Sequence, residues 1–497
     1  MTTLAQPDVL IVGSGAGGGT LARALAERGV KVLVAEAGRR IPREAANRDP
    51  KAVISHGRYD APARWTLNGK DQPQFVSRCV GGHTKFYGAV LMRMRAHDFQ
   101  AYATGDGVSP AWPIDLADLQ EHFGAAERYF QVHGPTDGGV TYPFPAPAWD
   151  PYFEEVAQRL RGAGLTPTAL PIAVRRASLA TGAKCEPCLT CDGFPCHLGA
   201  KADAETNGID VAASTGNCTL LEGWSAEHLQ VDGSGMRVRE VTLVDSAEEQ
   251  LRVRPSVVVL AAGAIETPRL LLRSVSHHHP NGLANGSGLV GCRYMSHINT
   301  ALSVLRAIAN PTMFQKQIGV HDYNVPGGAT APFGEIQLRG RLLRQHLVSW
   351  WPATAWLPSR LLKEVVGHSL DWWISTEDLP DERNRIWLDR SGDLHAYVRQ
   401  RNLRSHGALL RRFRSDLRRA GFRGPQVAVR MPLTGVGAGT CVMGTDQTNS
   451  VVDSWGRAHQ LDNLYIADGS VLVSSASVNF SLTIMALALR TADRILT

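Results

Sequence analysis

The chain has 497 residues, of which 44% are hydrophobic, and this composition is typical of one large folded unit with a substantial core. Its 52 basic and 46 acidic residues leave a net charge of +6, too small for this length to indicate a nucleic-acid partner, and the arginines of 411–419 recur at helical spacing, as on a solvated helix face. No apolar run is long enough to cross a bilayer, and the first one begins near residue 8 without room for a signal peptide, so we expect a cytoplasmic protein with reduced thiols and no membrane partner.

The first predicted elements form a nucleotide-binding unit. An apolar run at residues 8–12 predicts a buried parallel strand, which leads directly into a glycine-rich turn at 13–18. In such a turn the first glycine permits a tight bend, the second lets the backbone approach a pyrophosphate, and the third lets the next helix pack on the strand. We expect that helix at 20–28, with its N-terminal amides directed at the phosphates, and a second strand at 30–35 that ends on an acid able to bind a ribose. The predicted contacts with a dinucleotide are Gly13, Gly15, Gly18 and Glu36.

Four of the eight cysteines lie close together in the next distinctive segment: Cys185, Cys188, Cys191 and Cys196. Their spacing is similar to that of ferredoxins, in which thiolates converge on an iron–sulfur cluster, although the last gap is one residue longer and His197 stands where the bacterial pattern has proline. Thiolates at short spacing also suit zinc. The interpretation that we favour is a compact loop held by thiols or disulfides, without a metal or cluster.

Three later segments complete the nucleotide-binding unit. Residues 257–260 predict a buried strand, followed by a turn around Gly263 and a helix. Residues 462–470 predict a short strand that ends on Asp468, and residues 478–483 open a C-terminal helix. The unit is therefore dispersed over the chain, unlike the contiguous unit of an ordinary nicotinamide dehydrogenase.

With these segments, the chain resembles the glucose-methanol-choline (GMC) family of FAD-dependent oxidoreductases over nearly its whole length. Residues 80–89 resemble the family's second flavin-contacting loop, and residues 263–274 resemble its signature. The resemblance implies a small-molecule substrate and noncovalent FAD, because Phe86 stands where some relatives tether the flavin through a histidine, and we interpret His83 as a loop residue. The further cofactor contacts that it implies are Gly82, Thr84, Gly88, Ala226, Gly263, Asp468, Asn479 and Thr483.

The resemblance also implies an α/β fold, in which a Rossmann-like FAD-binding domain is interleaved with an antiparallel-sheet α+β substrate domain. In relatives the substrate sheet has helices behind it and an inner face that roofs the flavin. Five tryptophans fall in the substrate domain, and we expect most of them in the core and a minority in the pocket wall. The tryptophans are Trp350, Trp351, Trp356, Trp372 and Trp373. The predicted FAD-binding segments are 1–104, 199–298 and 433–497, and the predicted substrate segments are 105–198 and 299–432.

The position of the family's catalytic histidine is the main departure from the pattern. The family uses a histidine just before a Gly-Thr-x-x-Met-Gly stretch and a histidine or asparagine before the last helix. Asn479 matches the second position, whereas Val436 stands at the first, and residues 407–457 contain no histidine. Because an asparagine can donate a hydrogen bond but cannot accept a proton near neutral pH, alcohol oxidation needs another base. The predicted pocket-wall residues are Val436, Phe480 and His321, and His321 is a candidate for that base.

The other histidines receive structural interpretations. His297 lies in a segment that relatives place near the flavin domain, and His459 precedes a strand. The run from His277 to His279 precedes a Pro-Asn-Gly turn, which predicts an exposed loop rather than a metal site.

Three functions stay open on the sequence. The first is oxidation of a CH–OH group, or of another C–H bond, by hydride transfer to FAD, with the family's histidine either replaced by another base or made unnecessary by the acidity of the substrate. The second is a flavin enzyme of the lyase or light-driven decarboxylase type, which does not need that base. The third is an FAD-binding electron-transfer partner, if the cysteines hold an iron–sulfur cluster. Nothing in the sequence indicates the oligomeric state.

Overall fold

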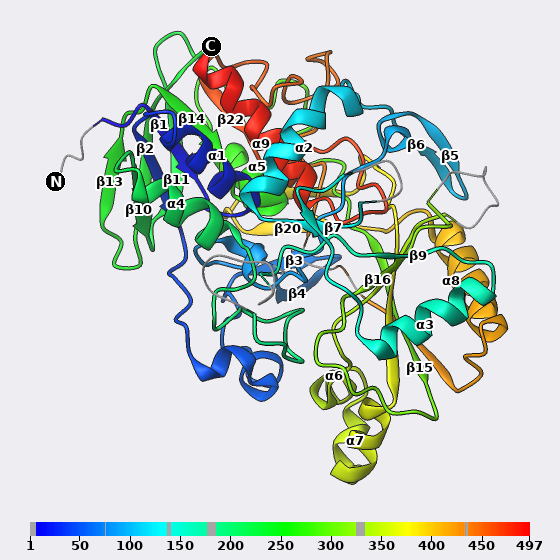
Figure 1. Cartoon of the computed structure of the whole chain (residues 1–497). Helices are drawn as coiled ribbons and strands as arrows, with labels where there is room; N and C mark the ends of the chain where they lie inside the picture. The colour runs from blue at the N-terminus through cyan, green and yellow to red at the C-terminus, as the bar shows by residue number, and fades with distance from the viewer. Residues whose placement is uncertain are drawn as a thin grey trace.

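The computed structural model describes residues 6–74, 76–136, 141–175, 185–324, 333–431, 433 and 436–497 (Figure 1). Its first layer is a five-stranded parallel sheet, whose apolar central strands are buried on both faces, as in sheets covered by helices. The strand order is β10 (Cys218–Glu222), β2 (Val32–Glu36), β1 (Val9–Val12), β14 (Val257–Leu260) and β22 (Leu464–Ile466). The sheet therefore unites segments from both ends and the middle of the chain, which confirms the predicted Rossmann-type layer.

Helices pack beside this sheet. In Figure 1, α1 (Ala16–Ala26) lies next to α9 (Ser481–Leu496), and α9 lies next to α2 (Leu116–Tyr129). The structure begins α1 at Ala16, earlier than the predicted residue 20. In its first turn, Gly17 packs closely on the C-terminal segment, since a Cβ there would lie 1.6 Å from the carbonyl oxygen of Ala467. On the side of β11, α5 (Gly263–Arg273) packs against a smaller antiparallel sheet. That sheet consists of β11 (Ser225–Val231), β12 (Val238–Val244) and β13 (Gln250–Val253).

The second large layer is a six-stranded sheet in which all neighbouring strands are antiparallel. Its order is β21 (Gln426–Arg430), β15 (Ile298–Leu305), β18 (Ser369–Thr376), β17 (Glu335–Leu338), β16 (Ile318–Val320) and β9 (Pro167–Ala169). One face packs on α3 (Pro151–Gly162) and α8 (Leu403–Arg419) through an apolar cluster that includes Trp372 and Phe413. Figure 1 shows both helices outside this sheet, which confirms the predicted antiparallel sheet with helices behind it.

A four-stranded sheet joins the two predicted domains. Its order is β19 (Arg385–Leu388), β20 (Leu394–Tyr397), β3 (Arg64–Leu67) and β4 (Lys70–Pro73). The strands β3 and β4 belong to a predicted FAD-binding segment, whereas β19 and β20 belong to a predicted substrate segment. The domain boundaries stay a prediction, and Pro432, at one of them, lies outside the described residues.

Shorter elements fill the connections between these layers. Among the described residues, no helix is both long and apolar enough to span a membrane. The remaining helices are α4 (Asp210–Ser214), α6 (Arg344–Trp350) and α7 (Ser359–Gly367), and the single turns are η1 (Ala45–Arg48), η2 (Lys51–Ser55), η3 (Gly82–Lys85), η4 (Ala96–Phe99), η5 (Ala204–Ile209), η6 (Pro352–Trp356) and η7 (Gly469–Val471). The remaining strands are β5 (Tyr102–Thr104), β6 (Gly107–Ser109), β7 (His133–Gly134) and β8 (Phe144–Pro145).

Candidate active site

A cavity of about 610 Å³ is lined by residues of both large layers. Its turn end is formed by the glycine-rich turn after β1 and by the C-terminal end of β2. Its roof end is formed by the inner face of the six-stranded sheet, because strand pairing places Gln337 opposite Trp373 and beside Gly319 on one face. The roof-end lining includes Asn299, Gln337, Arg339, Trp373 and Met431. One cavity therefore connects a nucleotide-type turn with the roof of the second layer.

The glycines of the glycine-rich turn differ in how closely other atoms pack against them. Gly13 has a φ of +100°, and a Cβ on it would lie 2.5 Å from the carbonyl oxygen of Ala261. Gly18 does not line the cavity, since a Cβ there would lie 2.0 Å from the carbonyl oxygen of Gly13. At Gly15, by contrast, a Cβ would meet no atom within 4 Å, and the residue lines the cavity. Gly15 therefore faces open space in the cavity, where a ligand can approach its backbone.

Glu36 closes the turn end, about where the sequence places a ribose-binding acid. One carboxylate oxygen accepts hydrogen bonds from the backbone N–H (2.9 Å) and hydroxyl (2.7 Å) of Ser14, and the other accepts one from the N–H of Gly38 at 2.9 Å. Burial raises the pKa of Glu36, although these bonds favour the charged form. The hydroxyl of Ser14 also accepts a bond from the N–H of Gly81 at 3.0 Å, which links the turn to the second loop.

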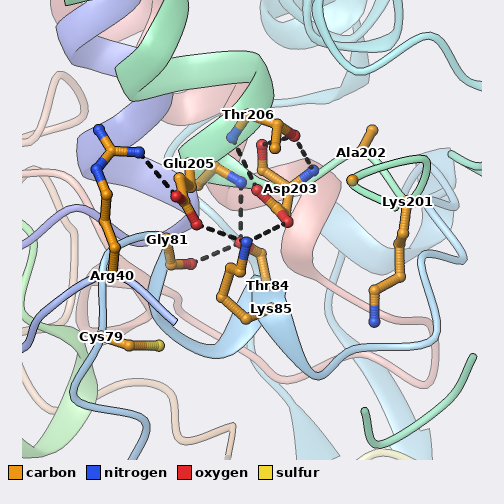
Figure 2. A network of polar contacts seen from close by, with 12 residues as sticks. Arg40, Cys79, Gly81, Thr84, Lys85, Lys201, Ala202, Asp203, Glu205 and Thr206 are labelled. Atoms are coloured by element: carbon orange, nitrogen blue, oxygen red, sulfur yellow. Dashed lines mark hydrogen bonds and ion pairs between the residues drawn. The ribbon is translucent and has the colours of Figure 1, made fainter. Parts of the chain in front are cut away.

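The second loop is anchored by a buried ion-pair network (Figure 2). The Nζ of Lys85 lies 2.9 Å from a carboxylate oxygen of Asp203 and 2.5 Å from one of Glu205, and Arg40 pairs with the other oxygen of Glu205 at 2.7 Å. Burial alone would lower the pKa of Lys85, but the two carboxylates raise it above its ordinary value. The hydroxyl of Thr84 donates to the Gly81 carbonyl at 2.6 Å and accepts from the backbone of η5. The network fixes the loop against η5, which packs on α1.

Asp468 joins the C-terminal segment to the start of α5. Its carboxylate accepts hydrogen bonds from the N–H of Gly263 at 2.8 Å, the hydroxyl of Thr267 at 2.6 Å and the N–H of Ser470 at 2.8 Å. The cavity lining includes seven of the predicted cofactor contacts besides those of the turn end: Gly82, Thr84, Gly88, Ala226, Gly263, Asp468 and Asn479. Thr483 is buried within α9 and does not line the cavity, which departs from the expectation for this residue.

Asn479 and Val436 lie where the turn end meets the roof. The Nδ2 of Asn479 is 3.4 Å from the carbonyl oxygen of Val90, and its amide faces the amide of Gln337 at 3.4 and 3.5 Å. These contacts are at the long limit for hydrogen bonds, so the Asn479 amide is weakly held. Val436 is half-buried and lines the cavity, and its side chain has no polar group. Gly435, the residue before it, lies outside the described residues.

His297 is the histidine that the structure adds to this region. Its ring packs on the ring of Phe480 with centroids 4.8 Å apart, and both residues line the cavity. Its Nε2 lies 2.9 Å from the carbonyl oxygen of Ser475. Burial lowers the pKa of His297 to about 4, so its ring is neutral near pH 7. The structural interpretation of His297 from sequence therefore missed that this residue lines the cavity. Its ring packs there on Phe480, the residue that follows Asn479 in the sequence.

The other predicted candidates lie elsewhere. His321 does not line the cavity, contrary to the expectation of a wall residue: it lies beyond the end of β16 and pairs with Glu335 at 3.0 Å. His459 bonds the hydroxyl of Ser450 at 2.8 Å. In the histidine run, His277 and His278 are exposed, whereas His279 is buried and bonds a backbone carbonyl.

The expectation that most of the five tryptophans lie in the core is wrong, because only one of them does. Trp350 and Trp373 line the cavity, and Trp372 is fully buried in the core behind the sheet. Trp351 and Trp356 are exposed, Trp356 by 91%. Sequence reasoning did not find the polar roof residues Gln337 and Arg339, although residues 335–339 alternate strictly between polar and apolar, the signal of a strand with one polar face.

The four clustered cysteines surround a separate hollow of about 20 Å³, together with His197 and Lys201. None of these cysteines forms a disulfide in the described part of the chain, and burial raises the pKa of Cys191 to about 12. The Nζ of Lys201 donates to the carbonyls of Cys191 at 3.1 Å and Phe194 at 2.7 Å. No group of three or more His, Cys, Asp or Glu side chains within the described ranges has an arrangement that could hold a metal ion. The absence of a metal here stays a prediction.

Comparison with known proteins agrees with this geometry. Residues 7–299 and 436–488 match the N-terminal and C-terminal models of the family described as GMC oxidoreductase. The 6'''-hydroxyparomomycin C oxidase of Streptomyces lividus is 31% identical over 516 aligned residues, which cover 98% of this chain and 91% of that protein. The paromamine 6'-oxidase of Streptomyces fradiae is 30% identical over 514 residues, with the same coverage of both chains.

The fold also matches a solved structure. The crystal structure of pyridoxine 4-oxidase from Mesorbium loti superposes with a TM-score of 0.69 and 19% identity, over 98% of this chain and 99% of that one. At this identity the likeness concerns the fold alone.

Proposed function

Because the chain belongs to the GMC oxidoreductase family, whose named relatives are oxidases and dehydrogenases, we propose that it oxidises a CH–OH group of a small organic substrate with noncovalently bound FAD. The observation that carries the proposal is the single cavity that runs from Gly15 and Glu36 to Asn479. A cofactor that spans this cavity has its nucleotide at the turn end and its reactive end below the roof.

The turn end fits the nucleotide part of FAD. The exposed backbone of Gly15 and the N-terminus of α1 would hold the pyrophosphate, because free backbone N–H groups at a helix N-terminus attract anions. Glu36 would bind a ribose, and the second loop, anchored through Lys85, would support the ring system. When bound, FAD accepts the hydride that leaves the substrate carbon.

Noncovalent binding is supported by the residue at the tether position. Phe86 does not line the cavity and packs near the ring of Tyr59, with centroids 6.4 Å apart. His83 does line the cavity, and its Nδ1 lies 3.1 Å from the hydroxyl of Ser77. We therefore assign His83 a supporting role in the loop.

The residues around Asn479 would orient the substrate hydroxyl and accept its proton. The Nδ2 of Asn479 can donate a hydrogen bond to the hydroxyl oxygen. His297 is the proposed proton acceptor, although its ring has backbone hydrogen bonds with both Ser475 and Val478. The proposal requires a tautomer with hydrogen on Nε2, donated to the Ser475 carbonyl, and a lone pair on Nδ1 that the substrate hydroxyl can reach. Val436 can play neither part, but it excludes water from this end of the cavity.

The test is flavin bleaching in an anaerobic stopped-flow experiment, with a panel of alcohols, sugars and hydroxy acids. We expect one or more hydroxyl compounds to bleach the flavin in the dark. Asn479→Ala and His297→Gln should each slow bleaching by about a hundredfold, within the range that positioned acid–base groups contribute. The matched control is His459→Gln, which removes a histidine remote from the cavity and should leave the rate unchanged.

Two outcomes would contradict the proposal. An unchanged rate in His297→Gln would exclude His297 as the proton acceptor. A flavin that stays oxidised with every hydroxyl compound, but consumes a carboxylate under blue light, would replace alcohol oxidation by the decarboxylase alternative.

A further inference from the structure

Arg339 is a buried cation in the cavity wall with unused hydrogen-bond donors. It follows directly after β17 and has only 8% of its surface exposed. Its Nε and Nη1 have no hydrogen-bond partner, and none of the ion pairs among the described residues includes it. Since a guanidinium keeps its charge in proteins and burial of an unpaired charge is costly, these donors call for an anion.

Two tryptophan rings hold the guanidinium in place without satisfying it. The carbon Cζ lies 5.4 Å from the ring centroid of Trp350 and 5.5 Å from that of Trp373, and both rings line the cavity. Such cation–π contacts orient the cation but form no hydrogen bonds with its N–H groups, and Nε and Nη1 are themselves enclosed by the wall. His346 stacks on Trp350 at 5.7 Å and adds no positive charge near pH 7, because burial lowers its pKa to about 3.

The nearby carboxylates are engaged with other groups. Asp371 accepts hydrogen bonds from the hydroxyls of Ser303 at 2.6 Å and Ser369 at 2.8 Å, and from a backbone N–H. Asp192 pairs with Lys316 at 3.1 Å and accepts a bond from the N–H of Gly340 at 3.1 Å. Around Arg339 the cavity lining therefore includes a second cation, Lys316, and the carboxylate of Asp192, which is paired with Lys316.

Lys316 also lies in the wall because the second loop leaves room for it. A Cβ on Gly88 would lie 2.2 Å from the Cε of Lys316, so the lysine stem crosses the loop at this glycine. Lys316 has 7% of its surface exposed and lines the cavity. The positive potential at the roof end is thus built into two separate elements of the fold.

The unpaired cation lies within reach of the reacting end. Gln337 contacts Asn479, and Arg339 is two residues further along the chain, directly after the end of β17, and also lines the cavity. Two residues of a strand span roughly 7 Å. A small molecule whose hydroxyl lies at Asn479 can therefore place a second group at Arg339.

We propose that Arg339 binds a carboxylate of the substrate, so that the substrate class of this enzyme is hydroxy acids whose carboxylate lies several atoms from the oxidised CH–OH group. The planar fork of N–H groups on a guanidinium matches the two oxygens of a carboxylate. This substrate class rests on the proposed oxidation, but binding of the carboxylate does not depend on it.

The first experiment measures binding of carboxylates that have no hydroxyl to oxidise. Isothermal titration calorimetry on the FAD-loaded protein compares 4-methylbenzoate and cyclohexanecarboxylate with their uncharged amides, which have nearly the same shape. We expect each carboxylate to bind about tenfold more tightly than its amide, or better. Equal affinities, or no saturable binding of either carboxylate, would overturn the proposal. Tighter binding of phenyl phosphate than of 4-methylbenzoate would overturn the assignment to a carboxylate.

Variants identify the cation responsible. Arg339→Met should abolish the preference for the carboxylates, whereas Arg339→Lys should retain part of it, because lysine keeps the charge but not the fork. Arg344→Met is the matched control, since Arg344 is an exposed arginine of α6 outside the cavity lining, and it should keep the full preference. A full preference in Arg339→Met would overturn the proposal. The comparison of acid and amide in the native chain needs no variant, so the test stands if Arg339→Met does not fold.

A second readout separates this proposal from the proposed function. Anaerobic flavin bleaching is followed with 4-(hydroxymethyl)benzoate and with its amide. Selective binding of carboxylates without bleaching by any hydroxyl compound would support the anion site and contradict the oxidation. Bleaching combined with equal binding of acids and amides would support the oxidation and overturn the anion site.

Discussion

The two ends of the cavity differ in how their polar groups are satisfied. At the turn end the charged groups bond to the protein itself: Glu36 accepts three hydrogen bonds, and Lys85 pairs with both Asp203 and Glu205. At the roof end the guanidinium of Arg339 has unbonded donors, and Asn479 makes only long contacts. The turn end is therefore complete without a small-molecule substrate, whereas the roof end has donors that a substrate can use.

This difference predicts where a substitution changes stability and where it changes substrate binding. A buried group that is fully paired supports the fold, and its removal leaves its partner uncompensated. A buried group with unused donors contributes little to the stability of the fold beyond packing, so its removal should mainly weaken ligand binding. Substitutions at Lys85 and in the glycine-rich turn test the effects on stability and cofactor binding at the turn end, and the Arg339 variants test ligand binding at the roof end.

The largest effect is expected for Lys85→Met. The substitution leaves Asp203 and Glu205 buried without their shared cation, and loss of one partner of a buried ion pair costs about 3–5 kcal/mol. Urea unfolding at neutral pH, followed by circular dichroism, should show this loss. The control is Arg64→Met, which breaks an exposed pair with Asp71 and should leave the midpoint unchanged. Equal midpoints for Lys85→Met and the native chain would show that the network does not support the fold.

A smaller and more selective effect is expected for Gly15→Ala. A Cβ at Gly15 meets no protein atom, so the apoprotein should unfold at the native urea concentration, but the methyl group would obstruct a pyrophosphate. We expect FAD affinity to fall by about tenfold or more, measured by the flavin retained on gel filtration. The contrasting variant is Gly18→Ala, whose Cβ would collide with the Gly13 carbonyl, and it should destabilise the apoprotein as well.

Two results would contradict the prediction for Gly15. Full retention of FAD by Gly15→Ala would show that the pyrophosphate does not approach this residue. Flavin that stays with acid-precipitated native protein would show a covalent bond, and His83, which lines the cavity, would then be the residue to examine.

The turn end could be predicted from sequence because its signals are local. The glycine-rich turn, the strands around it and Glu36 lie within a short stretch, and the structure brings them together as expected. The predicted start of α1 was wrong by a few residues, because the glycines assigned to the turn at 13–18 include the first residues of the helix.

The roof end could be predicted only in part, because its geometry depends on pairing between distant strands. The polar alternation of 335–339 indicates a strand, but sequence cannot show that the polar face borders a cavity rather than solvent. The same limit explains His321, which lies on β16's extension opposite Glu335 instead of in the cavity wall. It also explains His297, whose position beside Phe480 results from contact between the start of β15 and the segment before α9.

The smallest effect is expected in the pH dependence of flavin bleaching. Because burial lowers the pKa of His297 to about 4, its neutral, proton-accepting form is present above that pH and is lost only as the pH falls through it. The bleaching rate of the native protein should therefore be nearly flat from about pH 8 to about pH 5, without the limb that an ordinary imidazole produces near 6.5. Val436→His adds an imidazole to the cavity wall at the family's catalytic position, where it should add a limb near that value. A limb near 6.5 in the native protein would show that a histidine with an ordinary pKa, rather than His297, accepts the proton. The roof end would then contain a base whose pKa is already close to neutral pH.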